Sequence, residues 1–350
     1  MQQSLSPIVV RLRESLARVG VGDLLSEMEV GPPQAGPDQA MLALTRLEGE
    51  LEEARTRMPP PSRTFVPPVQ GRLRKWLGRW VAASSGITRS ESAPATKLAD
   101  STLLSTAMAQ RLAQRQVQQE IQRELRISKA ILMAESELAL GSVLLPSQWI
   151  DDQWLSRWSG YAANARSEMM LNLWGKILAR EAQSAGSFDL RTLDFLHSLS
   201  GGEAEKIARL MTFVVADIVF RGCDFLLADA GVSHEFLLEM QHLGLLFGVE
   251  ANNFTVTLTS LSQDRFEAGL PASGQMLVVR SSNPLQCCVL PSCKLTPMGR
   301  QISRLVEAEA HRGYLQKLGQ AIRAQGFDVQ LGRIRRTADQ GITLCDLHSI

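Results

Sequence analysis

Residues 151–220 read DDQWLSRWSGYAANARSEMMLNLWGKILAREAQSAGSFDLRTLDFLHSLSGGEAEKIARLMTFVVADIVF. Apolar side chains recur here every three or four positions, which predicts amphipathic helices. Gly- and Ser-containing breaks at 184–188 and 200–202 divide the stretch, and Ser200 with Glu203 forms a capping-box signature. The stretch therefore predicts three or four helices that enclose a dry core. We expect this core to contain Trp154, Trp158, Trp174, Ile177, Leu178, Phe188, Leu193, Leu196, Leu199, Ala204, Ile207 and Leu210.

A long helix is predicted immediately upstream of this stretch. Residues 99–140 contain no glycine or proline, and their apolar positions follow one helical face, which indicates a helix of about 60 Å. Two interpretations stay open, an arm that self-associates and a helix that packs on its own domain. Further upstream, the apolar spacing in 7–30 and 38–58 predicts a helical hairpin.

The segment between the hairpin and the long helix combines a linker with a basic helix. Residues 59–68, PPPSRTFVPP, are too rich in proline for a helix or a central strand. The following GRLRKWLGRW places two tryptophans one helical turn apart among four cations and no acid. Such a helix can dock on its own core, lie on a membrane or contact nucleic-acid phosphates. The candidate membrane or phosphate contacts are Arg72, Arg74, Lys75, Trp76, Arg79 and Trp80.

The pattern changes after residue 222. A short helix capped by Ser233 precedes strand-like runs at 254–259, 275–281 and 285–290. A helix over 297–325 and a strand over 328–333 follow. A helix ending in Gly-Leu-Leu, a small sheet and a Leu-Thr-x-x-Gly helix start are typical of a winged-helix-like unit.

These elements predict a mainly α fold, a helical bundle with a long helix, plus a C-terminal winged-helix-like α+β unit. A chain of 350 residues with 45% hydrophobic residues is long enough for about two such cores. The predicted domains are 1–58, a helical hairpin; 59–98, a Pro/Ser-rich linker with the basic tryptophan helix; 99–221, a central helical domain; and 222–350, the winged-helix-like domain.

Charge and cysteine content narrow the class of protein. The chain has 37 basic and 36 acidic residues, so no overall field attracts nucleic acid or anionic membranes. Its five cysteines show no disulfide framework, and its first residues carry charges where a signal peptide would be apolar. The longest apolar run, 210–220, is too short to cross a bilayer. We therefore expect a cytoplasmic protein.

No chemical motif in the sequence predicts a catalytic, metal or cofactor site. The adjacent thiols of Cys287 and Cys288 alternate faces of a strand, so with Cys293, His234 and His242 they make a poor zinc set. The pair Asp151 and Asp152 fits a helix start. Glu181 is expected to pair with Arg180, Arg191 or a helix N-terminus rather than to act as a base. Phosphate-binding loops, nucleophile elbows and metalloprotease helices are absent from the sequence. We expect neither catalysis nor a small-molecule substrate.

The predicted recognition helix starts at His234. Its outward side chains, Glu235, Glu239, Gln241 and His242, are acidic or neutral, and carboxylates repel phosphate. This favours a protein-interaction or dimerisation module over a DNA reader. The remaining candidate nucleic-acid contacts are Arg300, Arg304, Arg333, Arg335 and Arg336.

Two family resemblances are centred on the central helices. The first extends over about two thirds of the chain, to 111–138 upstream and to Leu295, Thr296, Gly299, Tyr314 and Leu315 downstream. The first is carried by Trp174, Ile177, Leu178, Ala179, Glu181, Gly186, Ser187, Phe188, Leu199, Ser200, Glu203 and Ala204. These residues resemble a bacterial domain-of-unknown-function family, in which a Trp-x-x-(Ile/Leu)-Leu-Ala-x-Glu helix precedes a Gly-Ser-Phe turn and a Leu-Ser-x-x-(Glu/Asp)-Ala helix. The chain departs from that pattern at Ala185, where proline is usual, and at Asp189, where serine is usual.

The same helices also resemble the Abi-alpha type of abortive-infection protein, which implies a role in bacterial defence against phage. Neither family supplies a catalytic residue. The sequence therefore predicts a non-enzymatic interaction protein with a protein partner or self-association. Membrane contact and nucleic-acid binding are secondary expectations, and a DNA-binding regulator is the alternative.

Overall fold

The computed structural model describes residues 7–22, 41–49, 99–139, 149–251, 254–336 and 342–350. The chain forms two compact units, Met1–Ala185 and Gly186–Ile350. The sequence analysis placed a domain boundary between residues 221 and 222. The basic tryptophan helix predicted at residues 72–80 lies outside the described residues.

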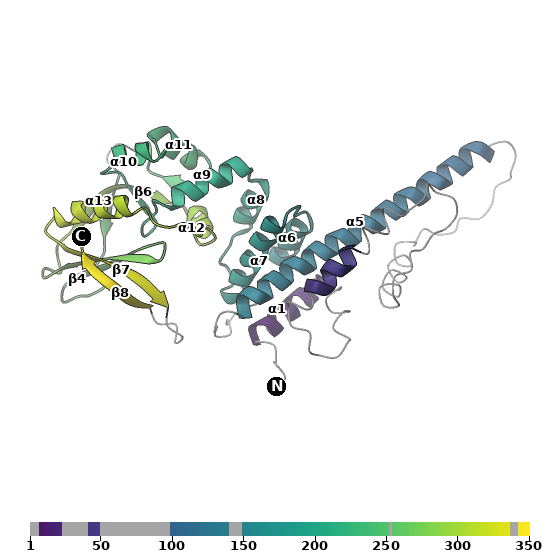
Figure 1. The fold of residues 1–350 in the computed structure, drawn as a ribbon, viewed down its shortest axis with the longest axis horizontal. Coiled ribbons are helices and arrows are strands. Elements are labelled where there is room, and N and C mark those ends of the chain that lie inside the picture. The colour runs from purple at the N-terminus through teal and green to yellow at the C-terminus, as the bar shows by residue number, and fades with distance from the viewer. Residues whose placement is uncertain (1–6, 23–40, 50–98, 140–148, 252–253, 337–341) are drawn as a thin grey trace. The chain divides into compact units, whose positions relative to one another are not determined.

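The N-terminal unit is helical. Residues 41–49 form a helical segment, and the other helices are α1 (Pro7–Arg18), α5 (Ala99–Ala139), α6 (Asp152–Ala163) and α7 (Glu168–Gln183). The predicted long helix is confirmed as α5 (Figure 1). The C-terminal part of α5 packs against α7 and α6, whereas Met108 and Leu112 are 68% and 57% exposed. The long helix therefore combines a buried part with an exposed part.

Two tryptophans form the centre of the N-terminal unit. Trp158 and Trp174 are completely buried, and the Trp158 indole Nε1 donates a hydrogen bond to the Trp174 carbonyl oxygen at 3.0 Å. Beside them, a Cβ atom added to Gly175 would lie 2.8 Å from Met133 Cβ and 3.0 Å from the Ala130 carbonyl oxygen. Glycine at this position therefore allows α7 to approach the backbone of α5.

An ion pair joins α1 to α5. The Arg13 guanidinium donates to both carboxylate oxygens of Glu135, at 2.5 Å and 2.7 Å. Glu135 is only 2% exposed. A carboxylate this well buried requires its partner, because an uncompensated charge in the interior is strongly unfavourable.

The C-terminal unit contains both helices and sheets. Its helices are α8 (Leu190–Ser198), α9 (Gly201–Met211), α10 (Asp224–Asp229), α11 (His234–His242), α12 (Pro297–Ser303) and α13 (Arg312–Arg323). Its strands are β1 (Ile218–Phe220), β2 (Leu246–Phe247), β3 (Thr255–Leu258), β4 (Phe266–Ala272), β5 (Gln275–Ser281), β6 (Cys288–Leu295), β7 (Asp328–Arg336) and β8 (Ile342–Ser349).

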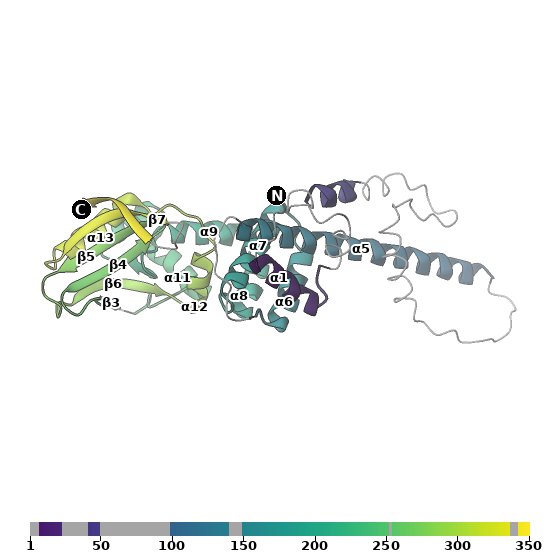
Figure 2. The same cartoon turned by 90° about the horizontal axis from the view of Figure 1, so that it is seen from below.

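These strands form two antiparallel four-stranded sheets. One has the order β1-β6-β2, with β3 also paired to β6, and the other has the order β4-β5-β7-β8. The prediction of a mainly α fold is therefore wrong, and the fold is α+β (Figures 1 and 2). The predicted C-terminal α+β region underestimated the number of strands.

The strands that the sequence analysis missed have identifiable reasons. The run before β1, residues 210–217, is mostly apolar, and short apolar runs do not distinguish helix from strand. Here Ala216 and Asp217 take positive φ angles of 47° and 67°. They form a tight turn in which Val215 and Ile218 exchange backbone hydrogen bonds of 2.9 Å. Strand β4 contains Gly269 and Pro271, which are unfavourable inside a central strand, but β4 lies at a sheet edge where proline is tolerated.

The predicted helix over 297–325 is interrupted. It forms α12 and α13, separated by residues 304–311. No glycine or proline marks this break, and it follows from contacts with distant residues. The His311 N–H donates to the Thr212 carbonyl oxygen at 3.0 Å, and the Ser273 hydroxyl donates to the Ala308 carbonyl oxygen.

The Leu-Thr-x-x-Gly signature has a clear structural role. The Thr296 hydroxyl accepts from the Gly299 N–H at 3.0 Å and donates to the Gly244 carbonyl oxygen at 2.5 Å. A Cβ atom on Gly299 would lie 2.3 Å from the Leu245 carbonyl oxygen. The signature therefore joins the start of α12 to the Gly-Leu-Leu segment after α11, and only glycine fits at the contact.

Helix α13 packs on one face of the β4-β5-β7-β8 sheet, against β5 and β7 (Figure 2). Its buried residues are Tyr314, Leu315, Leu318, Gly319 and Ile322. The Tyr314 hydroxyl accepts a hydrogen bond from the Phe220 N–H at 2.6 Å, which links α13 to β1 of the other sheet. Among the described residues, no helix is both long enough and apolar enough to cross a membrane.

Candidate functional site

The outward face of α11 is the first candidate interaction surface. His234, Glu235 and His242 are exposed, while Phe236, Leu237 and Met240 face the core. Glu239 is half-buried and forms an ion pair with Lys206 of α9 at 2.6 Å. Gln241 does not join this face, because its side chain accepts from the Val249 N–H at 2.8 Å and supports the turn after β2. The exposed face therefore remains acidic to neutral.

The five arginines proposed as nucleic-acid contacts fall into two groups. Arg300 and Arg304 belong to α12 and its C-terminal cap, and the other three belong to β7. Arg300 lies 3.9 Å from the Asp217 carboxylate, measured from Nε to Oδ2. Arg333 and Arg335 are exposed. The five predicted arginines therefore do not lie on one continuous helix face.

The cysteines of β6 do not form a metal site. Cys288 and Cys293 are buried in β6, whereas Cys287, just before β6, is exposed. No group of three or more His, Cys, Asp or Glu side chains is placed for metal binding in the part of the chain that the structure describes. Burial raises the pKa of Cys223, Cys288 and Cys293 to about 11. These thiols stay protonated near neutral pH, which makes them weak nucleophiles and weak metal ligands.

The raised thiol pKa values predict a loss of stability in alkali. Unfolded thiols ionise near 9.0, but Cys288 and Cys293 ionise at about 11 in the folded chain. The unfolded chain therefore releases protons first, and the free energy of unfolding should fall as the pH rises from about 9 to about 11. The slope should reach about 1.4 kcal/mol per pH unit for each buried thiol.

Denaturant titrations at a series of pH values measure this slope. A Cys288→Ala/Cys293→Ala variant should be less stable at neutral pH but should have a flatter dependence above pH 9. An unchanged alkaline slope in that variant would show that other groups cause the loss.

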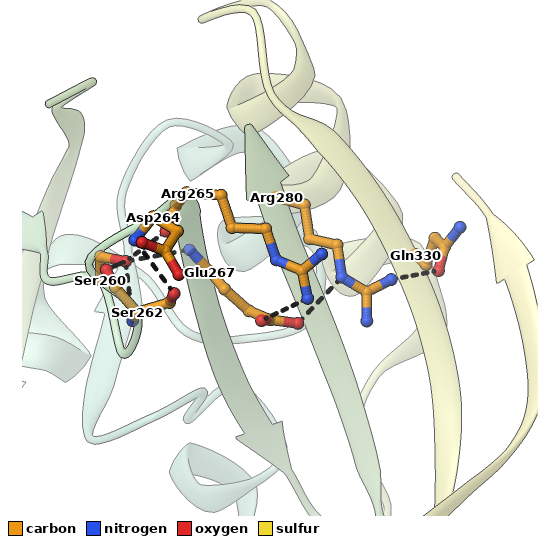
Figure 3. A network of polar contacts seen from close by, with 7 residues as sticks. All are labelled: Ser260, Ser262, Asp264, Arg265, Glu267, Arg280 and Gln330. Carbon is orange, nitrogen blue, oxygen red and sulfur yellow. Dashed lines mark hydrogen bonds and ion pairs between the residues drawn. The ribbon is translucent and has the colours of Figure 1, made fainter. Parts of the chain in front are cut away.

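A polar network crosses the β4-β5-β7-β8 sheet (Figure 3). The Glu267 carboxylate accepts from Arg280 Nε at 3.0 Å and from Arg265 at 3.2 Å. Arg280 also donates to the Gln330 side-chain oxygen at 3.2 Å. The Arg280 hydrogen bond, followed by that of Arg265, lowers the pKa of Glu267. A carboxylate held between two guanidinium groups stays ionised and is a poor general base. We therefore interpret the network as structural.

The other acidic candidates also have structural positions. The Asp151 carboxylate caps α6 by accepting from the Trp154 N–H at 2.9 Å, as the sequence predicted. Glu181 is 3% exposed on α7. Within the predicted core, Leu199 is only half-buried and Ala204 is exposed, because both lie at the edge of the α9 N-terminus.

The sequence analysis missed a cationic surface on α13. The outward side chains of this helix include Arg312, Gln316, Lys317, Gln320 and Arg323. No Asp or Glu occurs between Glu309 and Asp328. This absence of acids is a sequence signal, but its meaning depends on knowing which face of the helix is exposed.

Comparison with known proteins finds one family match. A family model described as a protein of unknown function (DUF2806) matches residues 110–218, which extend from α5 to the start of β1. No curated protein and no solved structure matches the chain. The chain therefore contains, over residues 110–218, a region similar to the DUF2806 family of proteins of unknown function.

Proposed function

We propose that this is a non-enzymatic interaction protein that recognises a protein partner through the exposed face of α11. The observation that carries the proposal is an acidic to neutral helix surface presented on a winged-helix-like arrangement. The resemblance of the central helices to abortive-infection proteins suggests that the interaction serves defence against phage in the bacterial cytoplasm.

The arrangement of α9 to β6 supports the winged-helix-like interpretation. In chain order, α9, β1, α10 and α11 precede β2 and β3, and β6 then inserts between β1 and β2. A helix-turn-helix of this kind presents its second helix to a partner. The hairpin of β4 and β5 lies between β3 and β6 in the sequence. A winged-helix domain has its wing between the corresponding strands, so this hairpin would be an enlarged wing.

The charge of α11 favours a protein over a DNA duplex as the partner. His234 and Glu235 are exposed at its N-terminal end, where DNA-reading helices usually contact the bases. A carboxylate at this position repels phosphate. A basic protein surface would instead gain an opposite charge on contact, which increases the rate and specificity of association.

Site-specific photo-crosslinking in phage-infected cells tests the proposal. A photoreactive residue in place of Glu235 should form one dominant adduct with a protein, whereas the same residue in place of the exposed Arg191 of α8 should not. In a second variant, the photoreactive residue replaces His242 and Glu235→Lys is added. This change should reduce both the crosslinked adduct from position 242 and the protection against phage.

Equal crosslinking from both positions would argue against a dedicated α11 surface. Salt-sensitive retention of duplex DNA by the full chain, lost in Arg333→Gln/Arg335→Gln, would support the DNA-binding regulator instead.

A further inference from the structure

We infer that α13 and α10 together form a binding surface for single-stranded nucleic acid. This α10–α13 surface consists of Phe225 from α10 with Arg312, Gln316, Lys317 and Gln320 from α13. It shares no residue with the α11 face, so the inference goes beyond the proposed protein partner and does not depend on it.

The cationic part of the surface follows from the amphipathic pattern of α13. Its apolar residues pack into the core of the C-terminal unit, which leaves the Arg and Gln residues on the outward stripe. Arg312, Gln316 and Gln320 are spaced by four residues and lie along one side of the helix. Among the described residues, none forms an ion pair with Arg312 or Lys317. Their charges are therefore available to an external anion.

Phe225 supplies the aromatic part of the surface. Its side chain is 91% exposed, although neighbouring Leu227 of the same short helix is buried. Helix α10 adjoins the first turn of α13, because Leu226 Cδ1 lies 3.7 Å from the position of a Cβ atom on Gly313. The charge of Lys317 also reaches Cys223, where it lowers the thiol pKa against the larger effect of burial. Helix α10, which carries the exposed ring, and the cationic helix α13 therefore lie side by side.

Two carboxylates of α10, Asp224 and Asp229, lie near this region, and neither is on α13. Asp224 is paired with Arg221 through two hydrogen bonds of 2.8 Å. Asp229 lies at the far end of α10, and α13 itself carries no acid.

The side-chain chemistry favours single-stranded nucleic acid over a membrane or a duplex. An interfacial membrane helix exposes its apolar face to lipid, but the apolar face of α13 is buried in its own unit. Arginine and glutamine donate hydrogen bonds to phosphates and base edges. An exposed aromatic ring stacks on unpaired bases, which a duplex keeps stacked inside. Cations, amides and an exposed phenylalanine thus match a flexible polynucleotide.

Fluorescence anisotropy of the full chain with a labelled single-stranded oligonucleotide of mixed sequence tests the inference. We expect salt-sensitive binding, and Arg312→Gln/Lys317→Gln should reduce the slope of log K against log salt by about 1.4, since each phosphate contact contributes about 0.7. Phe225→Ala should weaken binding about tenfold through the loss of stacking.

A matched control removes two exposed cations from other helices or loops. Arg166→Gln/Arg191→Gln changes the net charge equally and should leave affinity within about twofold of the unmodified chain. Absence of binding at low salt would overturn the inference, as would equal losses in the test and control variants. Binding to vesicles of anionic lipid that depends on the same residues, without oligonucleotide binding, would identify a membrane surface and also overturn it.

Discussion

Replacing Trp158 by alanine should reduce the free energy of unfolding of the N-terminal unit by about 4 kcal/mol. Trp158 is completely buried, so its truncation leaves a large cavity that the surrounding helices fill only in part. It also removes the hydrogen bond from Nε1 to the Trp174 carbonyl oxygen. The loss should appear as a shift of the denaturant midpoint measured by intrinsic fluorescence.

Fluorescence suits this measurement because all six tryptophans of the chain lie before residue 185. Their signal therefore reports on the N-terminal unit and not on the C-terminal unit. A signal specific to one unit is needed because a chain of two units can unfold in more than one step. The control Trp158→Phe retains a ring and should cost about half as much as alanine. If the alanine variant unfolds at the same denaturant concentration as the unmodified chain, Trp158 does not contribute to stability as we expect.

Replacing Arg13 by methionine should destabilise the N-terminal unit by about 3 kcal/mol, because it leaves the Glu135 carboxylate buried without its main cation. Glu135 is 2% exposed, and the substitution removes both hydrogen bonds that Arg13 donates to it. Methionine has a similar length and isolates the effect of charge from that of packing. Denaturant unfolding followed by fluorescence gives the difference.

The double variant Arg13→Met/Glu135→Met provides the matched control. Removing both charges should recover most of the lost stability, since a buried ion pair is often replaceable by apolar residues of similar size. The coupling energy between the two positions then follows from the double-mutant cycle. Equal destabilisation by the single and double variants would contradict the proposed cost of an unpaired carboxylate.

The helices of residues 99–211 could be predicted because their evidence is local. The capping box of Ser200 and Glu203 is present as predicted, and the buried tryptophans occupy the positions that helical spacing indicated. The long helix α5 has almost the predicted bounds. Hydrophobic spacing and caps act within a few residues of each other, so a single sequence contains them in full.

The strands were harder to predict because their pairing joins distant segments. Strand β5 pairs with β7, so Val279 lies opposite Val329, and β1 pairs with β6 far along the chain. Strand β4 tolerates Gly269 and Pro271 because of its edge position, which the sequence does not show. The fold class was therefore wrong even though several individual elements were right.

The candidate surfaces also differ in whether local sequence or distant contacts define them. The exposed Glu235 and His242 of α11 could be predicted from helix periodicity, but the contact of Gln241 with Val249 could not. The α10–α13 surface was not readable, since Phe225 and Arg312 come from segments far apart in the sequence.

By itself, the sequence determined the helical core, its caps and the absence of acids along residues 310–327. Only the tertiary structure decided which strands pair, where the C-terminal helix breaks and which polar residues share a surface. The physical reason is range: caps and helical periodicity act between near neighbours, whereas sheet pairing and burial depend on contacts between residues that only folding brings together.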